Sequence, residues 1–202
     1  MTPTGSRTQR QRSAEMRARL IDATIHCLRT GGYGYATTRN IAASAEVSLG
    51  ALAHQFAGRT ALIAAAIDEV GRRCVDELAR RVRSIPADDP RRPAEILDAA
   101  WAIFDSDLFV VWIKVWAAAA EDDGLYAALA PVEKELSRAI AATVDQLIPD
   151  GMTASRWKAR SSVVLAAMRG VAFANALEPR DSVAADKWPI VRGELLALVE
   201  AR

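Results

Sequence analysis

The residues of this chain that are best suited to chemistry are hydroxyl groups and an arginine that lie close together within residues 32–62. Thr37, Thr38 and Arg39 are consecutive, and Ser48 follows a short distance later. Hydroxyls, guanidinium groups and the backbone amides at a helix start all bind phosphate oxygens. These residue types at this spacing therefore indicate a surface that binds a polyanion, not a catalytic centre.

The same segment has the pattern of two short helices joined by a tight turn. A first helix over residues 37–45 begins with two threonines, which favour helix starts. Glu46-Val47 predicts the turn, and Ser48 caps a second helix over residues 49–56. This shape places its second helix in the DNA major groove, although the segment alone also fits an ordinary helical hairpin.

Positive charge is concentrated in the same part of the chain. Residues 1–60 carry eight arginines and three acidic residues, a net charge of +5, whereas residues 61–202 carry a net charge of −4. Arginine pairs with phosphate through a planar fork of N–H donors. The asymmetry favours a nucleic acid as the partner of the first part, with a solvated charged tail as the alternative.

Patterns typical of enzymes and metal sites are absent from the sequence. His26 and His54 are its two histidines, and it has no Ser-His-Asp order, no metal-ligand spacing and no glycine-rich phosphate loop. Cys27 and Cys74 lack CxxC spacing, so we expect small buried apolar residues in a reducing compartment. We predict no enzyme activity, no cofactor and no metal; a helical enzyme or small-molecule carrier is the rival hypothesis.

Membrane and export signals are also missing from the pattern. The longest apolar run, residues 108–120, is interrupted by Lys114 and is too short to span a bilayer. The first thirty residues hold no apolar block before a small-residue cleavage site. We therefore expect a cytoplasmic protein with no membrane partner.

Helical patterns dominate the whole chain, and alternating strand patterns are absent, which predicts an all-α fold. We expect residues 1–12 to be polar, basic and mobile, and Pro131 to be the first residue of its helix. The expected helices are residues 13–30, 37–45, 49–56, 59–84, 93–104, 106–120, 131–148, 153–177 and from 189 to the C-terminus.

These features resemble the TetR family of bacterial transcriptional regulators. The resemblance covers residues 14–70 with specific motifs and most of the rest by helix order. Its motif residues are Gly32-Tyr33, Thr37, Arg39, Ile41-Ala42, Val47-Ser48, Gly50, Leu52, Phe56, Arg59 and Leu62. The resemblance implies a three-helix DNA-binding domain with a basic N-terminal arm (1–58) and a helical bundle for ligand binding and dimerisation (59–202).

The DNA-binding residues follow from the helix pattern and from the resemblance. They are Thr37, Thr38, Arg39, Ser48, Leu49, Gly50, Ala51, His54, Gln55 and Arg59, with Arg7, Arg10 and Arg12 in the arm. Arg39 fits either a guanine or a phosphate, and Gln55 fits adenine. Two positions depart from the family pattern: Ala53 replaces a common phosphate-binding tyrosine, and Glu46 replaces the usual turn glycine, which predicts a right-handed turn or local strain.

Aromatic residues concentrate beyond residue 100 at helical spacing, which fits either an ordinary core or an apolar ligand pocket. The pocket hypothesis assigns Trp101, Phe104, Phe109, Trp112, Trp116 and Phe173 to the site. Asp98, Asp105 and Asp107 nearby raise the further alternative of a cationic ligand.

Small residues around Gly170 predict close approach of a partner helix and a two-fold homodimer formed by the last two helices. The resulting hypothesis is a repressor that binds a palindromic operator in double-stranded DNA. It releases this operator when an unidentified, mostly apolar small-molecule inducer binds. An architectural DNA-binding protein without a ligand is the other alternative.

Overall fold

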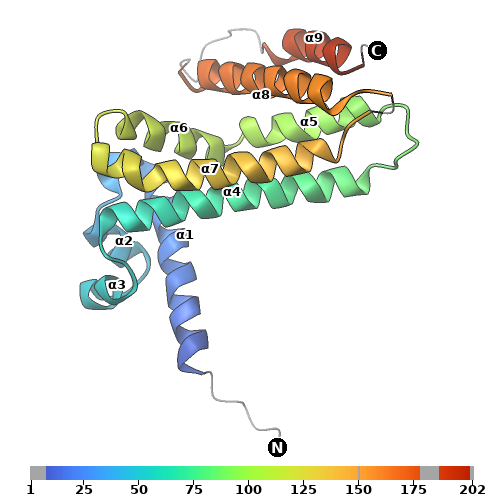
Figure 1. The fold of residues 1–202 in the computed structure, drawn as a ribbon. Coiled ribbons are helices and arrows are strands. Elements are labelled where there is room, and N and C mark those ends of the chain that lie inside the picture. The colour runs from blue at the N-terminus through green and yellow to red at the C-terminus, as the bar shows by residue number, and fades with distance from the viewer. Residues whose placement is uncertain (1–7, 150, 178–186, 201–202) are drawn as a thin grey trace, which may run out of the picture. The chain divides into compact units, whose positions relative to one another are not determined.

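The computed structural model describes residues 8–149, 151–177 and 187–200, and the regular elements in these ranges are all helices (Figure 1). They are α1 (Gln9–Tyr35), α2 (Thr38–Ser44), α3 (Leu49–Gln55), α4 (Arg59–Ser84), α5 (Arg92–Phe104), α6 (Asp107–Ala119), α7 (Asp123–Asp145), α8 (Ala154–Leu177) and α9 (Trp188–Glu200). The all-α prediction is confirmed for these ranges. Arg7 of the expected basic arm lies outside the described residues.

The helices form two compact units. The first unit contains the chain up to Val70 together with Lys114–Glu133, and the second contains Gly71–Ile113 and the chain from Lys134 onward. Helices α4, α6 and α7 therefore each contribute one part to each unit. The domain boundary inferred from the sequence stays a proposal.

Helix α1 is longer than the sequence predicts at both ends. At its start Thr8 and Gln11 form a capping box, in which Gln11 N donates to Thr8 Oγ1 at 3.3 Å and Thr8 N donates to Gln11 Oε1 at 2.8 Å. The helix therefore starts at Gln9, four residues before the predicted start at residue 13. At the other end Gly32 adopts a φ of 70° and kinks the helix, which continues to Tyr35.

Fully buried aliphatic side chains stabilise the first unit. Leu20 and Leu28 of α1, Ile41 of α2, and Leu62 and Ile63 of α4 are at most 1% exposed. Burial of one such side chain contributes about 1.5–3 kcal/mol. Because these residues come from three helices, their packing sets the position of the short helix α2.

Helix α7 begins earlier than the sequence predicts. The Asp122 carboxylate accepts a hydrogen bond from Leu125 N at 2.9 Å, so the helix starts at Asp123 and contains Pro131 in its interior. The prediction that Pro131 is its first residue is wrong. An internal proline costs about 3 kcal/mol, and the complete burial of Leu125 and Leu129 offsets that cost in the turns before it.

Helices α5, α8 and α9, together with Phe109 of α6, build the core of the second unit, and α8 and α9 lie side by side (Figure 1). The core cluster is Leu97, Trp101, Phe109, Val164, Met168, Ala172, Trp188 and Leu195. The rings of Trp101 and Trp188 stack with centroids 4.2 Å apart. Arg192 of α9 donates to both carboxylate oxygens of Asp98 of α5, at 2.6 Å and 2.7 Å. The ring stack and this ion pair hold α9 against α5.

Candidate functional site

The first short helix of the site begins with a side-chain cap. Thr37 has an extended backbone, and its Oγ1 accepts a hydrogen bond from Asn40 N at 3.2 Å. Asn40 Nδ2 in turn donates to the carbonyl of Tyr35 at 2.8 Å. These two bonds fix the entry of the chain into α2 and place Thr38 and Arg39 in its first turn.

The turn between α2 and α3 has a left-handed backbone at a residue that is not glycine. Glu46 has a φ of 54°, and its N–H donates to Ala43 O at 3.1 Å while Val47 N donates to Ala42 O at 2.9 Å. A left-handed conformation costs a residue with a side chain roughly 1–2 kcal/mol. Of the two possibilities that the sequence left open, local strain is the correct one.

Helix α3 buries one side and exposes the other. Ser48 Oγ accepts from Ala51 N at 3.1 Å, as the sequence predicts for a cap. Leu52 and Phe56 are buried and anchor the helix. Of the residues predicted to contact DNA, Ser48, Leu49, Gly50 and His54 are exposed, and Ala51 and Gln55 are half-buried.

Two contacts attach the end of α3 to α1. Gln55 Nε2 donates to Ser13 Oγ at 3.1 Å, and the Arg17 guanidinium lies 4.2 Å from the centre of the Phe56 ring. A cation above an aromatic face contributes about 0.5–1 kcal/mol at an exposed site. The Gln55 amide, predicted to pair with adenine, therefore already has a partner inside the protein.

Arg59, the first residue of α4, also has partners inside the first unit. Its Nε donates to Ala36 O at 3.0 Å, its Nη2 donates to Tyr33 O, and its guanidinium lies 3.9 Å from the centre of the Tyr33 ring. These contacts satisfy carbonyl groups where the kinked end of α1 leads into α2. The sequence predicted Arg59 as a DNA contact but gave no sign of this internal role.

Tyr33 connects Arg59 to the turn between α6 and α7. Its hydroxyl donates to Asp122 Oδ2 at 3.1 Å. Burial raises the pKa of Tyr33, and the Arg59 charge opposes that shift. The pKa of Asp122 is lowered, first by the backbone hydrogen bond from Leu125 and then by Tyr33. The Tyr33 hydroxyl therefore stays protonated and Asp122 ionised near neutral pH, which preserves this contact.

Arg39 differs from Arg59 although both were predicted to bind DNA. Its side chain is exposed, and within the described part of the chain it has no hydrogen bond or ion pair. Its guanidinium is therefore available to an external anion. The structure brings Arg39 together with Thr38 in α2 and with Thr37, which caps that helix, and the exposed residues of α3 follow after the turn.

The six aromatic residues predicted to line a pocket occupy different surroundings. In the second unit, Phe109 packs edge-on against Phe104 at 4.9 Å and stacks with Trp112 at 5.4 Å, while Trp101 stacks with Trp188 as described above. Trp116 belongs to the first unit and packs edge-on against Tyr126 at 6.0 Å. Phe173 is 48% exposed. The aromatic pocket stays a prediction.

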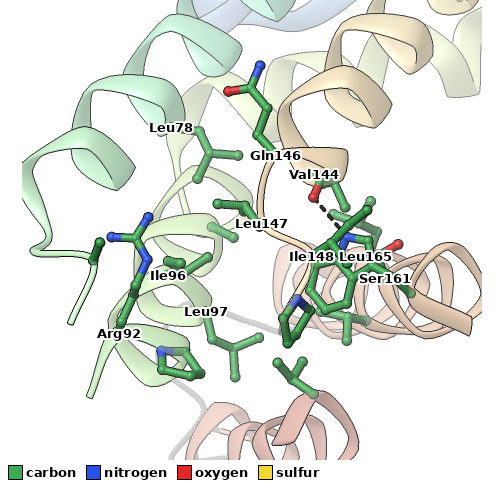
Figure 2. Close-up of a pocket in the computed structure, with 17 residues that line it drawn as sticks. Leu78, Arg92, Ile96, Leu97, Val144, Gln146, Leu147, Ile148, Ser161 and Leu165 are labelled. Carbon is green, nitrogen blue, oxygen red and sulfur yellow. Dashed lines mark hydrogen bonds between the residues drawn. The ribbon is translucent and has the colours of Figure 1, made fainter. Parts of the chain in front are cut away.

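The second unit contains a cavity of about 390 Å³ that these six aromatic residues do not line. Its walls come from α4 and the segment after it, α5, the end of α7 and the segment after it, α8 and α9, and Figure 2 shows the side chains that line it. Trp157 forms part of the wall, and its Nε1 donates to Val144 O at 2.8 Å. The sequence gave no sign that the space beside Val144 and Leu147 is open.

Asp98 is one of the three acidic residues that raised the alternative of a cationic ligand, and it is already paired. Asp98 is engaged by both donor atoms of Arg192, so its charge is already balanced. Among the described residues, no group of His, Cys, Asp and Glu side chains has an arrangement that would hold a metal ion. No helix in the same ranges is long and apolar enough to cross a bilayer.

Residues 20–66 match the family model described as bacterial regulatory proteins, tetR family. An uncharacterized HTH-type transcriptional regulator of Mycobacterium tuberculosis is 40% identical over 91 residues, which are 45% of this chain and 47% of that protein. The HTH-type transcriptional regulator BetI of Paraburkholderia phytofirmans is 32% identical over 105 residues, 50% of this chain and 52% of BetI. The matches thus span about half the length of these curated relatives.

Solved structures show the same fold over nearly the whole chain. A putative transcriptional regulator from Pseudomonas aeruginosa PAO1 aligns with a TM-score of 0.68 at 21% identity, over 96% of this chain and 93% of that one. The multidrug binding protein EbrR, solved with imidazole, aligns with a TM-score of 0.65 at 24% identity, over 100% and 99% of the two chains. At these identities the likeness concerns the fold alone.

Proposed function

The chain belongs to the TetR family of bacterial regulatory proteins, and on that premise we propose that it is a DNA-binding transcriptional regulator. The observation that carries the proposal is the match of residues 20–66 to the family model. These residues include the two short helices α2 and α3 and the exposed Arg39 in α2. Helix α3 would enter the major groove, and the start of α2 would contact the adjacent phosphates.

The proposed contacts divide into two groups. Arg39, with the hydroxyls of Thr37 and Thr38, supplies the main phosphate contacts, and the exposed residues of α3 meet base edges. Arg59 and Gln55 support this surface through their bonds to the chain around α1, and a direct contact of either with DNA stays a prediction. The exposed residues of α3 that would meet the bases are weakly polar, so the affinity for DNA would come mainly from contacts with phosphates.

We further propose that the regulator is a homodimer formed through α8 and α9. Val163 and Phe173 of α8 are 54% and 48% exposed, Ile190 of α9 is 73% exposed, and Ala166 and Gly170 lie along the same exposed side of α8. Exposed apolar side chains at helical spacing favour a partner helix. Two linked DNA-binding units also give specific binding that one small unit with few phosphate contacts lacks at cellular salt.

Regulation by a small molecule completes the proposal. A ligand that favours one arrangement of the second unit would act through α4, α6 and α7, because each of these helices runs through both units. The change that the ligand causes in the free energy of DNA binding cannot exceed the difference between its binding free energies for the two arrangements. We propose repression with release of the operator on ligand binding.

In-vitro selection of DNA from a random pool tests the function. We expect the full chain to enrich a palindrome whose half-sites lie about one helical turn, roughly 34 Å, apart. Recovery of unrelated sequences, or no enrichment at low salt, would contradict a sequence-specific regulator. A single half-site bound by a monomer would contradict the dimer and leave the DNA-binding assignment in place.

A further inference from the structure

We propose that the cavity of the second unit binds an amphipathic carboxylate, a molecule with an apolar body and one anionic end, and that Arg92 receives the anion. The inference rests on the proposed function in one respect: it names the chemical class of the regulating ligand. Whether such a ligand binds is a property of the second unit itself and can be measured without DNA.

The composition of the cavity wall selects against cations. Among the described residues that line it, Arg92 is the charged one, and Gln146 and Ser161 are the uncharged polar side chains. The rest of the wall is apolar, and it holds no carboxylate. Figure 2 shows Arg92 at one side of the cavity and Ser161 at the other, with Ile96 and Leu97 between them. Pockets of roughly 300–1,000 Å³ that are mostly apolar with few polar groups bind small ligands.

The side of the Arg92 guanidinium that carries Nε and Nη2 has the geometry that binds a carboxylate. Its Nη1 donates to the carbonyl oxygens of Ile85 and Pro86, the second at 3.2 Å. Those bonds leave Nε and Nη2 without a partner among the described residues. The parallel N–H donors of Nε and Nη2 are the fork that binds a carboxylate through two hydrogen bonds. The loop carbonyls thus hold the guanidinium in place without neutralising its charge.

The neighbouring Arg91 has the opposite surroundings and provides a matched control. Its guanidinium pairs with Asp89 at 3.2 Å and Glu95 at 3.6 Å, and its side chain is 75% exposed. Arg91 is not part of the cavity wall. The two consecutive arginines therefore differ in their surroundings: the charge of Arg91 is balanced by carboxylates at the surface, and Arg92 lines the mostly apolar cavity.

Calorimetry with three eight-carbon probes tests the inference on the purified full chain: octanoate, 1-octanol and octyltrimethylammonium. We expect octanoate to bind more tightly than 1-octanol, and octyltrimethylammonium to bind most weakly. Arg92→Met should weaken octanoate binding by roughly tenfold or more, because one charge-assisted contact is lost. Arg91→Met should leave octanoate binding unchanged.

The 1-octanol probe shows whether Arg92→Met still folds, since its binding needs the apolar walls and not the charge. Unchanged 1-octanol binding with weakened octanoate binding supports the proposal. Equal binding of octanoate by the wild type and Arg92→Met, or no binding of octanoate by the wild type, overturns it. A protein that binds octanoate but selects no DNA would instead overturn the proposed function.

Discussion

Replacement of Arg59 and of Arg39 by methionine should damage different properties of the protein. Arg59→Met removes two hydrogen bonds from a guanidinium to carbonyl oxygens and a contact with the Tyr33 ring. Hydrogen bonds to charged groups contribute about 1.5–3 kcal/mol each, but water replaces part of that at a half-buried site. We therefore expect a loss of about 2–3 kcal/mol in the free energy of unfolding, which lowers Tm by roughly 5–10 °C.

Arg39→Met should leave stability nearly unchanged. The side chain is exposed and makes no hydrogen bond or ion pair with other described residues, so the expected change in unfolding free energy is within about 0.5 kcal/mol. Binding to the selected operator should weaken instead. If Arg39 contacts phosphate, the slope of log K against log salt should become shallower by about 0.9.

Thermal melts followed by circular dichroism, together with fluorescence anisotropy of labelled operator at several salt concentrations, separate the two effects. For Arg59→Met, the DNA measurements are made well below its melting temperature. A variant of Arg59 that melts like the wild type but loses salt dependence would refute the internal role. A variant of Arg39 with unchanged affinity and slope would refute the assignment of the phosphate-binding surface.

Three further predictions follow from single residues. Ser48→Ala removes the cap on Ala51 N and should destabilise the protein by about 1 kcal/mol, measured by urea denaturation; an unchanged midpoint would argue against the cap. Gly170→Arg should convert the dimer to a monomer in light scattering while the monomer stays helical by circular dichroism, because an added Cβ at Gly170 meets no atom within 4 Å and Gly is the weaker helix former. A dimer of unchanged affinity would exclude α8 from the interface. Burial raises the pKa of the Cys74 thiol to about 11, so its alkylation rate should still rise between pH 9 and 11, and a plateau near pH 9 would contradict that burial.

Local signals in the sequence were sufficient for much of the DNA-binding unit. The caps formed by Thr37 and Ser48 each involve an amide three residues ahead, and α4 spans the predicted residues 59–84. Such signals act within one helical turn and are readable from neighbouring residues. Pro131 misled the prediction because its preference for a helix start competes with the Asp122 cap, and the buried leucines between them favour the longer helix.

Contacts between residues distant in sequence determine which basic residues already have partners inside the protein, and the sequence did not predict these contacts. Arg39 and Arg59 lie in one basic segment and look alike in sequence. Arg59 differs from Arg39 because it binds the carbonyls of Tyr33 and Ala36, which follow the kink at Gly32. A basic side chain near a helix-turn-helix is therefore evidence of a DNA contact only after its internal partners are known.

The ligand site illustrates the same limit for apolar residues. Helical spacing identifies which side chains face inward, and Trp101 and Phe109, predicted to belong to a core or a pocket, are both buried. Spacing carries no information on whether the space between helices is filled, because that depends on side chains distant in sequence. The stack of Trp101 on Trp188 fills one part of the second unit, while the wall with Arg92 leaves another part open. If the cavity binds a carboxylate as proposed, an arginine without a counter-charge in its wall will have identified the ligand site where the density of aromatic rings did not.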